Sequence, residues 1–136
     1  MEWKTLSEKE KLMSDSSKKH FFYIEDAIKY RTDEALILQH IKFWMFKNKD
    51  KPTHQHYEKV WMYQSVTNMM SDFPYWKRNK IQKLLKRMEV KELIVSDSFN
   101  KKKYDKTKWY SLASPLYEQW LSHNGLMESS KRTNGI

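Results

Sequence analysis

The chain of 136 residues is long enough for one domain with a modest core and too short for two domains of usual size. Lys and Arg outnumber Asp and Glu by 26 to 17, and the resulting charge of +9 predicts a polyanionic partner: nucleic acid first, then an acidic protein or an anionic membrane. Without cysteine, a long apolar run or a leader pattern, the sequence excludes a disulfide framework, a thiolate metal site and a membrane span, and it predicts a cytoplasmic protein.

The N-terminal part of the chain predicts an arm, a short strand and a buried helix. Residues 1–19 are charged and lack a sustained period, so they are interpreted as a flexible arm before a single domain at residues 20–122. Phe21–Ile24 is aromatic and β-branched, which favours a short strand. Thr32 is a suitable N-cap for a helix that continues to about Phe46. The apolar residues of this helix cover most of its circumference and predict a central, largely buried position: Leu36, Ile37, Leu38, Ile41, Phe43, Trp44 and Met45.

The next segment predicts a loop, a strand and a short helix. Residues 47–59 are polar and include a proline, which indicates a loop, and Val60–Tyr63 is expected to form a short strand. Ser65 is suited to cap a helix that Pro74 ends. The apolar positions of this helix keep helical spacing: Val66, Met69, Met70 and Phe73.

A turn at Tyr75 and Trp76 then leads into a second helix, expected from Lys77 to about Val90. Its apolar residues recur at i, i+3, i+4 and i+7 and predict one inward stripe: Ile81, Leu84, Leu85 and Met88. The opposite face is polar and basic: Asn79, Gln82, Lys83 and Lys86, flanked by Lys80 and Arg87.

The C-terminal part predicts a β-hairpin and a closing helix. Leu93–Phe99 and Thr107–Leu112 are the two strands, joined by a polar, basic turn at residues 100–106. Pro115 is expected at the start of a short helix, and residues 123–136 are expected to form a disordered tail.

Helix, turn, helix and hairpin in this order predict an α+β, mainly α fold: a winged helix-turn-helix with a β-hairpin wing. In the closing helix, Trp120 and Leu121 are expected either to pack back onto the domain or to pair with a second copy. A monomer and a homodimer are therefore both compatible with the sequence.

Most of the positive charge is concentrated between Trp76 and Lys108. These 33 residues hold 12 Lys and Arg against 4 Asp and Glu, a difference of +8 out of the total of +9. On the helix alone, Lys83 and Lys86 are equally compatible with an ordinary solvated face. The added run Lys101–Lys103, with Lys106 and Lys108, favours a polyanionic partner, because like charges repel unless a partner compensates them. A basic helix can enter a DNA major groove while a basic loop contacts the neighbouring phosphates.

The stretch from Val60 to Tyr110 resembles the winged-helix domain of replication initiators and replisome organisers from phages and plasmids of Gram-positive bacteria, including DnaD-type proteins. The most specific likeness is the wing, where NKKKYDKTKWYSL resembles an Asn-rich tip followed by an Asp-x-Thr-Lys-Trp-Tyr strand. DFPYWKRNKIQKLLKRMEVKELIVS resembles the turn, recognition helix and first wing strand, and EALILQHIKFWM resembles the opening helix. The likeness covers roughly residues 20–120 and implies DNA binding through the third helix and the wing.

The resemblance implies DNA contacts at Asn79, Lys83, Lys86 and Lys101–Lys103. The complete predicted DNA-binding set is Lys77, Arg78, Asn79, Lys80, Gln82, Lys83, Lys86, Lys101, Lys102, Lys103, Tyr104 and Lys106. Among the aromatic residues, Tyr104 is expected at the interface and Trp109 is expected to pack on the core, whereas Trp76 is compatible with either place.

Three features depart from the family pattern. Lys77 stands where the family usually has a capping Ser, so either another group caps the helix or Lys77 is there for a phosphate. Glu92 stands where the family has Gly, which costs about 1 kcal/mol if the backbone is left-handed there. Family members normally continue into a domain for self-assembly or helicase loading, and nothing after Trp120 is expected to serve that purpose. DNA binding is therefore expected here with or without the replication role.

Catalytic and metal-binding signals are weak. His54 and His56 form an H-x-H pair, but polar Gln55 separates them and only Glu58 is a third ligand nearby, so neither a rolling-circle nuclease nor a metal site is expected. Both glycines lie in the tail, which excludes a Gly-rich phosphate cradle. We therefore expect no cofactor and no enzymatic activity.

The leading hypothesis is a non-enzymatic protein of phage or plasmid type that binds double-stranded DNA, in replication initiation or as a small transcriptional regulator. The alternative is a phage-encoded accessory factor or inhibitor that uses the winged-helix surface to bind a host replication or defence protein, or a protein–nucleic acid complex. Binding that weakens steeply with salt distinguishes DNA from a protein partner.

Overall fold

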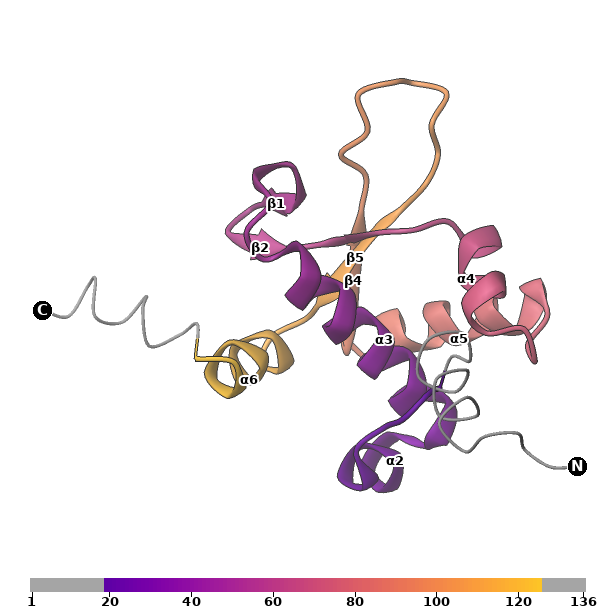
Figure 1. Ribbon diagram of the computed structural model, residues 1–136. Coiled ribbons are helices and arrows are strands. Elements are labelled where there is room, and N and C mark those ends of the chain that lie inside the picture. The colour runs from indigo at the N-terminus through magenta and orange to yellow at the C-terminus, as the bar shows by residue number, and fades with distance from the viewer. Residues whose placement is uncertain (1–18, 126–136) are drawn as a thin grey trace, which may run out of the picture.

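Five α-helices, one 3₁₀ turn and five strands make up residues 19–125, the part of the chain that the computed structural model describes (Figure 1). The α+β class is therefore confirmed, with helix as the larger share. Residues 1–18 of the expected arm and 126–136 of the expected tail lie outside the described residues. Within residues 19–125, no helix is long and apolar enough to cross a membrane. The elements are α2 (Ile24–Tyr30), α3 (Thr32–Asn48), the 3₁₀ turn (Pro52–His54), β1 (Gln55–His56), β2 (Lys59–Val60), β3 (Met62–Tyr63), α4 (Val66–Asp72), α5 (Arg78–Val90), β4 (Ile94–Asp97), β5 (Trp109–Leu112) and α6 (Leu116–His123).

The larger sheet has three antiparallel strands in the order β3–β5–β4. β4 and β5 form the predicted hairpin, in which Ile94 lies opposite Leu112 and Asp97 opposite Trp109. All four residues of β5 are buried, because β5 is the middle strand and α3 packs on it. The buried Ser111 in this strand donates a hydrogen bond to the carbonyl of Val60 at 2.7 Å, which ties the hairpin to the preceding strands.

The helix–turn–helix formed by α4 and α5 agrees with the sequence prediction. Ser65 is the N-cap of α4, since its Oγ accepts a hydrogen bond from the backbone N–H of Asn68 at 3.1 Å. After α4, Phe73 is fully buried and Pro74 lies in the turn. The predicted inward stripe of α5 is buried: Ile81, Leu84, Leu85 and Met88. This stripe determines which faces of α5 remain outside.

Two predictions for the N-terminal part are wrong. Residues 21–23 form no strand, and Ile24 begins helix α2. A strand needs a neighbour, and both sheets are built from later segments, whereas the carbonyl of Tyr23 accepts from the Ala27 N–H at 3.1 Å and starts a helix. Thr32 is the first residue of α3 and not its N-cap, because Arg31, with φ of 120°, takes the cap position and no side chain caps the helix.

Helix α3 is central but less buried than expected. Its fully buried apolar residues lie on one face: Ala35, Ile37, Leu38, Ile41 and Met45. Phe43, by contrast, is 49% exposed, so the helix packs on one side only. α3 also extends past Phe46 to Asn48, whose buried side chain donates to the carbonyl of Trp61 at 2.9 Å and holds the last turn.

The segment between α3 and α4 is more structured than the predicted loop and strand. Residues 47–59 include the 3₁₀ turn and most of the β1–β2 hairpin, and the expected strand Val60–Tyr63 is divided at Trp61 between the two sheets. The backbone N–H of Trp61 donates to the carbonyl of His54 at 2.9 Å, and its indole N–H donates to the carbonyl of His56 at 2.8 Å. These two hydrogen bonds fix the crossing from one sheet to the other.

Helix α6 closes the fold as predicted, starting after Pro115 and ending at His123, one residue into the expected tail. Trp120 is only 4% exposed. The hydroxyl of Tyr117 accepts a hydrogen bond from the Val60 N–H at 3.0 Å. Trp120 therefore packs back onto the domain, which is one of the two arrangements expected for this helix. Whether the protein is a monomer or a homodimer stays a prediction.

A buried carboxylate ties α5 to α3. Glu34 is fully buried, and its Oε2 accepts hydrogen bonds from Arg87 Nε at 3.0 Å and Lys91 Nζ at 2.9 Å. Burial by itself raises the pKa of Glu34, but the hydrogen bonds and charges of Lys91 and Arg87 outweigh it and hold the pKa below its ordinary value of 4.5. Lys80 and Asp33 form a second ion pair between these helices at 2.6 Å. The contacts set the orientation of α5 against α3.

Glu34→Gln is expected to lower the free energy of unfolding by about 1–3 kcal/mol near neutral pH, because two cations lose their anionic partner. The side chains of Arg87 and Lys91 are 39% and 41% exposed, so water keeps the loss below that for a fully buried pair. Since the folded pKa of Glu34 lies below 4.5, the advantage of the wild type is fully present above about that pH and is lost as the pH falls through the folded pKa. Urea unfolding of both proteins at about pH 7 and pH 3 measures this difference, and an equal difference at the two pH values contradicts it.

Candidate nucleic-acid interface

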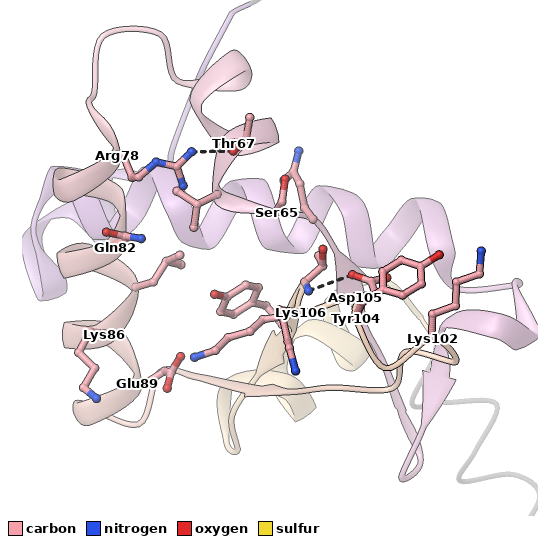
Figure 2. Close-up of a pocket in the computed structure, with 16 residues that line it drawn as sticks. Ser65, Thr67, Arg78, Gln82, Lys86, Glu89, Lys102, Tyr104, Asp105 and Lys106 are labelled. Carbon is pink, nitrogen blue, oxygen red and sulfur yellow. Dashed lines mark hydrogen bonds between the residues drawn. The ribbon is translucent and has the colours of Figure 1, made fainter.

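The N-terminal end of α5 is joined to α4 by one side-chain hydrogen bond. Arg78 Nη2 donates to Thr67 Oγ1 at 2.7 Å (Figure 2). Lys77 occupies the N-cap position with an extended backbone, and its side chain makes no capping hydrogen bond. The N-terminus of α5 therefore has no side-chain cap of the kind that a Ser at this position would give. The ammonium group of Lys77 is exposed and can contact a ligand.

The backbone at the C-terminal end of α5 is left-handed at Glu92, the position where the family pattern has Gly. Glu92 has φ of 60°. Its N–H donates to the carbonyl of Glu89 at 2.9 Å, and the N–H of Leu93 donates to the carbonyl of Met88 at 2.9 Å, which is a Schellman motif. Leu93 and Met88 are both buried in the core, so this packing offsets the strain of about 1 kcal/mol at Glu92. The motif directs the chain from α5 into β4.

The loop between β4 and β5, residues 98–108 and here called the hairpin loop, is held by one asparagine and one aspartate. Asn100 Nδ2 donates to the carbonyls of Asp105 and Thr107, both at 2.8 Å, and Asn100 Oδ1 accepts from the indole N–H of Trp109 at 2.7 Å. Asp105 accepts from the Thr107 N–H at 3.0 Å and from the hydroxyl of Tyr63 at 2.6 Å. The hydrogen bond from Tyr63 lowers the pKa of Asp105 and raises that of Tyr63. A loop dense in lysines is thus fixed in one shape.

The histidine pair lies at the base of the hairpin loop, where it packs against aromatic rings. His56 stacks on Phe99 with ring centroids 3.9 Å apart, and His54 and His56 lie 5.3 and 5.4 Å from the ring of Trp109. Burial lowers the pKa of His54, and the charges of Lys51 and His56 act in the same direction. Within residues 19–125, no group of three or more His, Cys, Asp or Glu side chains is placed to hold a metal ion. The pair therefore has a packing role between the two hairpins.

A groove of about 850 Å³ separates the outer side of α5 from the hairpin loop, with the N-terminal end of α4 at its edge (Figure 2). Five cationic side chains line it: Arg78, Lys86, Lys102, Lys106 and Lys108. Its other polar lining includes Gln82, Glu89 and Tyr104. The fold thus brings the basic helix and the basic loop, which are separated along the chain by strand β4, to the two sides of one groove.

The groove contains half of the predicted DNA-binding set. The predicted residues that line it are Arg78, Gln82, Lys86, Lys102, Tyr104 and Lys106. Those that do not line it are Lys77, Asn79, Lys80, Lys83, Lys101 and Lys103. On α5 the groove follows the face that adjoins the buried stripe. Arg78, Gln82 and Lys86, which are four residues apart, lie together on this face. Asn79 and Lys83 lie on the adjacent face, farther from the stripe. Lys80 is occupied by the ion pair with Asp33.

Sequence reasoning missed several residues of the groove. Lys108 lines it, and its charge was counted in the basic run of the hairpin loop, but it was not among the predicted contact residues. Thr67 and Glu89 also line it, but nothing in their local sequence distinguishes them from other surface residues. Asn100 and Asp105 organise the loop through hydrogen bonds, and only their place in the NKKKYDKTKWYSL segment pointed to them.

The aromatic residues divide between core and surface. Trp109 is buried at 8% exposure, as expected. Tyr104 is 76% exposed at the groove, and Lys102 Nζ lies 5.7 Å from the centroid of its ring. Trp76 is half-buried and stacks on Phe73 with ring centroids 5.0 Å apart, so it packs on the core. Tyr104 is therefore an aromatic ring that a ligand in the groove can reach.

The positive charge of the groove is poorly compensated by the protein. Within residues 19–125, four of its cations form no ion pair: Lys86, Lys102, Lys106 and Lys108. The fifth, Arg78, hydrogen bonds to the neutral Thr67. The lining holds two carboxylates, Glu89 and Asp105. Asp105 accepts hydrogen bonds from Tyr63 and Thr107, and the charge of Lys102 acts on it without a direct ion pair. An anionic ligand can therefore enter without displacing an ion pair.

Cations, amides and an aromatic ring are the groups with which proteins contact phosphates and bases. No protein-family model, curated protein or solved structure matches this chain. The surface of the chain presents a fixed basic loop facing a basic helix across an open groove.

Asn100→Ala is expected to weaken binding of a polyanion although it removes no charge. The substitution leaves two carbonyls and the Trp109 indole without their partner, and each unmade hydrogen bond at a partly buried site costs about 1 kcal/mol or more. The hairpin loop then loses its fixed shape. Hydrogen exchange of residues 100–108 measures the loosening, and Asn68→Ala on the exposed side of α4 is the control that should leave this exchange unchanged. Wild-type exchange in the Asn100 variant is incompatible with this role.

Proposed function

We propose that this protein is a non-enzymatic, cytoplasmic DNA-binding protein with a winged-helix fold. In this proposal α5 is the recognition helix and the hairpin loop is the wing. The order of helix α3, strand β3, helices α4 and α5 and hairpin β4–β5 supports this architecture. The outer side of α5 enters the major groove of double-stranded DNA, and the hairpin loop contacts neighbouring phosphates.

The observation that carries the proposal is the groove between α5 and the hairpin loop, with its five cations and few compensating carboxylates. Each uncompensated cation can neutralise one phosphate and release counterions, which is the main source of affinity in non-specific DNA binding. Gln82 lies between the cations on α5 and can hydrogen bond to a base edge. The arrangement thus combines phosphate contacts with one group able to read sequence.

The resemblance to replication initiators and replisome organisers supports a narrower role. We propose a protein of phage or plasmid type that acts in replication initiation or as a small transcriptional regulator. The first role requires binding at an origin, and the second requires binding at an operator. Genome-wide recovery of the DNA bound by the tagged chain in its native host separates the two.

A second candidate is a protein partner with an acidic surface, such as a host replication or defence protein. The observation that favours it is the 76% exposed ring of Tyr104 at the groove, because aromatic anchors are enriched at protein interfaces. An acidic protein, however, offers carboxylates at irregular spacing, whereas the basic helix and loop face each other across one continuous groove. Double-stranded DNA, with its regular phosphates, therefore remains our proposal.

Fluorescence anisotropy with a labelled duplex tests the proposal. We expect the full chain to bind a duplex with Kd of about 10⁻⁴–10⁻⁶ M or tighter at physiological salt, and to bind a single strand of the same length more weakly. Unlabelled polyglutamate should compete poorly. Absence of binding in this range, or equal competition by polyglutamate, would refute the proposal and favour the acidic protein partner.

A further inference from the structure

The β1–β2 hairpin ends in a turn in which both residues are strained. Tyr57 and Glu58 have φ of 54° and 61°, a left-handed conformation that residues other than Gly, Asn and Asp rarely adopt. A two-residue hairpin turn of this kind needs positive φ at both positions, and Asn-Gly is the dipeptide that supplies it with least strain. Tyr-Glu is therefore an unfavourable sequence for this turn.

Packing within the fold does not explain the choice of residues. Tyr57 is 75% exposed, and Glu58 is exposed as well. Within residues 19–125, neither side chain makes a hydrogen bond or an ion pair. Among the aromatic rings of residues 19–125, the ring of Tyr57 contacts that of Phe99, edge-to-face at 5.5 Å between centroids. Strained residues that the fold itself does not require are found mostly where a ligand is bound.

The contact with Phe99 places the turn beside the basic hairpin loop. His56, which precedes Tyr57, stacks on Phe99, and Phe99 is followed closely by Lys101. Figure 1 shows the β1–β2 hairpin and the hairpin loop at the same end of the larger sheet. Lys101 and Lys103 are exposed on this loop but do not line the groove. The exposed ring of Tyr57 therefore lies next to the loop and outside the groove.

We propose that Tyr57 makes a second, neutral contact to the DNA backbone, beside the segment that the hairpin loop holds. This inference rests on the proposed function. The phenol hydroxyl donates a hydrogen bond to a phosphate oxygen, and the ring covers the adjoining sugar. Because Tyr57 carries no charge, the contact strengthens binding without adding to its salt dependence. The stack of His56 on Phe99 holds the turn in register with the loop.

The decisive variant replaces the turn by its least strained sequence, Tyr57→Asn with Glu58→Gly. Removal of the strain should raise the melting temperature by about 4–8 °C. Compared with Glu58→Gly alone, which removes the same carboxylate, loss of a hydrogen bond to a charged phosphate should weaken duplex binding by about tenfold at fixed salt, with the same slope against salt in the two variants. Glu58→Gly alone is the matched control, since it relieves part of the strain and keeps Tyr57, and it should raise the melting temperature without weakening binding.

Tyr57→Phe isolates the hydroxyl and should account for most of the loss in affinity. Three results overturn the inference. The double variant binds the duplex as tightly as Glu58→Gly alone, or its salt slope is lower than that of Glu58→Gly, as for a lost cation. The third is a melting temperature below that of the wild type, which would mean that the ring of Tyr57 is needed for packing. In each of these cases wild-type binding to the duplex persists, so the proposed function stands. Absence of duplex binding by the wild type itself overturns the proposed function and this inference with it.

Discussion

Replacing Lys86, Lys102 and Lys106 together with alanine is expected to weaken duplex binding by about 10²–10³-fold at about 0.1 M salt. All three line the groove and form no ion pair within residues 19–125. Each cation that neutralises a phosphate contributes about 0.9 to the slope of log K against log salt, so the slope should fall by about 2.7. Anisotropy titrations of wild type and variant at several salt concentrations measure both quantities.

The control for this variant removes the same charge elsewhere. Lys29, Lys47 and Lys51 are exposed and lie outside the groove lining. Their combined replacement by alanine should change the slope by less than about 1, since long-range attraction is screened beyond about 10 Å. Equal losses in the two triple variants would mean that net charge, and not the groove, determines binding.

Leu84→Ala is expected to lower the free energy of unfolding by about 2–5 kcal/mol. Leu84 is 1% exposed in the inward stripe of α5, where truncation removes buried apolar surface and leaves a cavity in the core. DNA binding should be lost only as the domain unfolds, so it should recover when the temperature is lowered. Thermal melting together with duplex titration at two temperatures separates the two effects.

Gln82→Ala is the matched variant on the groove side of the same helix. Gln82 is exposed and makes no side-chain hydrogen bond within residues 19–125, so its loss should change stability by less than about 0.5 kcal/mol. Discrimination between a preferred and a scrambled duplex should fall by about 1–3 kcal/mol if Gln82 reads a base. A large loss of stability in this variant would show that the two sides of α5 were assigned the wrong way round.

The elements that sequence predicted correctly carry local signals. Helix α4 has the capping Ser65 at its start and Pro74 after its end. Helix α5 repeats apolar residues at helical spacing, and the β4–β5 hairpin has two β-favouring runs around a polar turn. Such signals need no knowledge of tertiary contacts, which is why these boundaries were correct to within a few residues.

The elements that sequence missed have no such signal. Helix α2 is separated from α3 by Arg31 at φ of 120°, and the β1–β2 turn is Tyr57-Glu58, so neither break contains the Gly or Asn that usually marks positive φ. The aromatic run Phe21–Ile24 suggested a strand. In the structure Tyr23 is instead the N-cap of helix α2, and Ile24 is its first residue. The secondary structure of these segments therefore depends on tertiary contacts that the local sequence does not reveal.

The sequence identified both the basic helix and the basic loop, and it placed Asn79, Gln82, Lys83 and Lys86 together on the outer face of the helix. The groove follows one side of that face, through Arg78, Gln82 and Lys86. DNA contacts at Asn79 and Lys83 stay a prediction. Which side of the helix faces the groove depends on the tertiary placement and shape of the hairpin loop, and the hydrogen bonds of Asn100 that fix this shape are not visible in the sequence.

The salt dependence of duplex binding by the full chain tests the central claim most directly, because contacts to phosphates release counterions and contacts to an uncharged surface do not. If each of the five groove cations neutralises one phosphate, log K should fall linearly with log salt with a slope of about −4.5 or steeper. The measurement is an anisotropy titration between about 0.05 and 0.2 M salt. A slope near zero, or no binding at the lowest salt, would contradict the assignment of this groove to DNA.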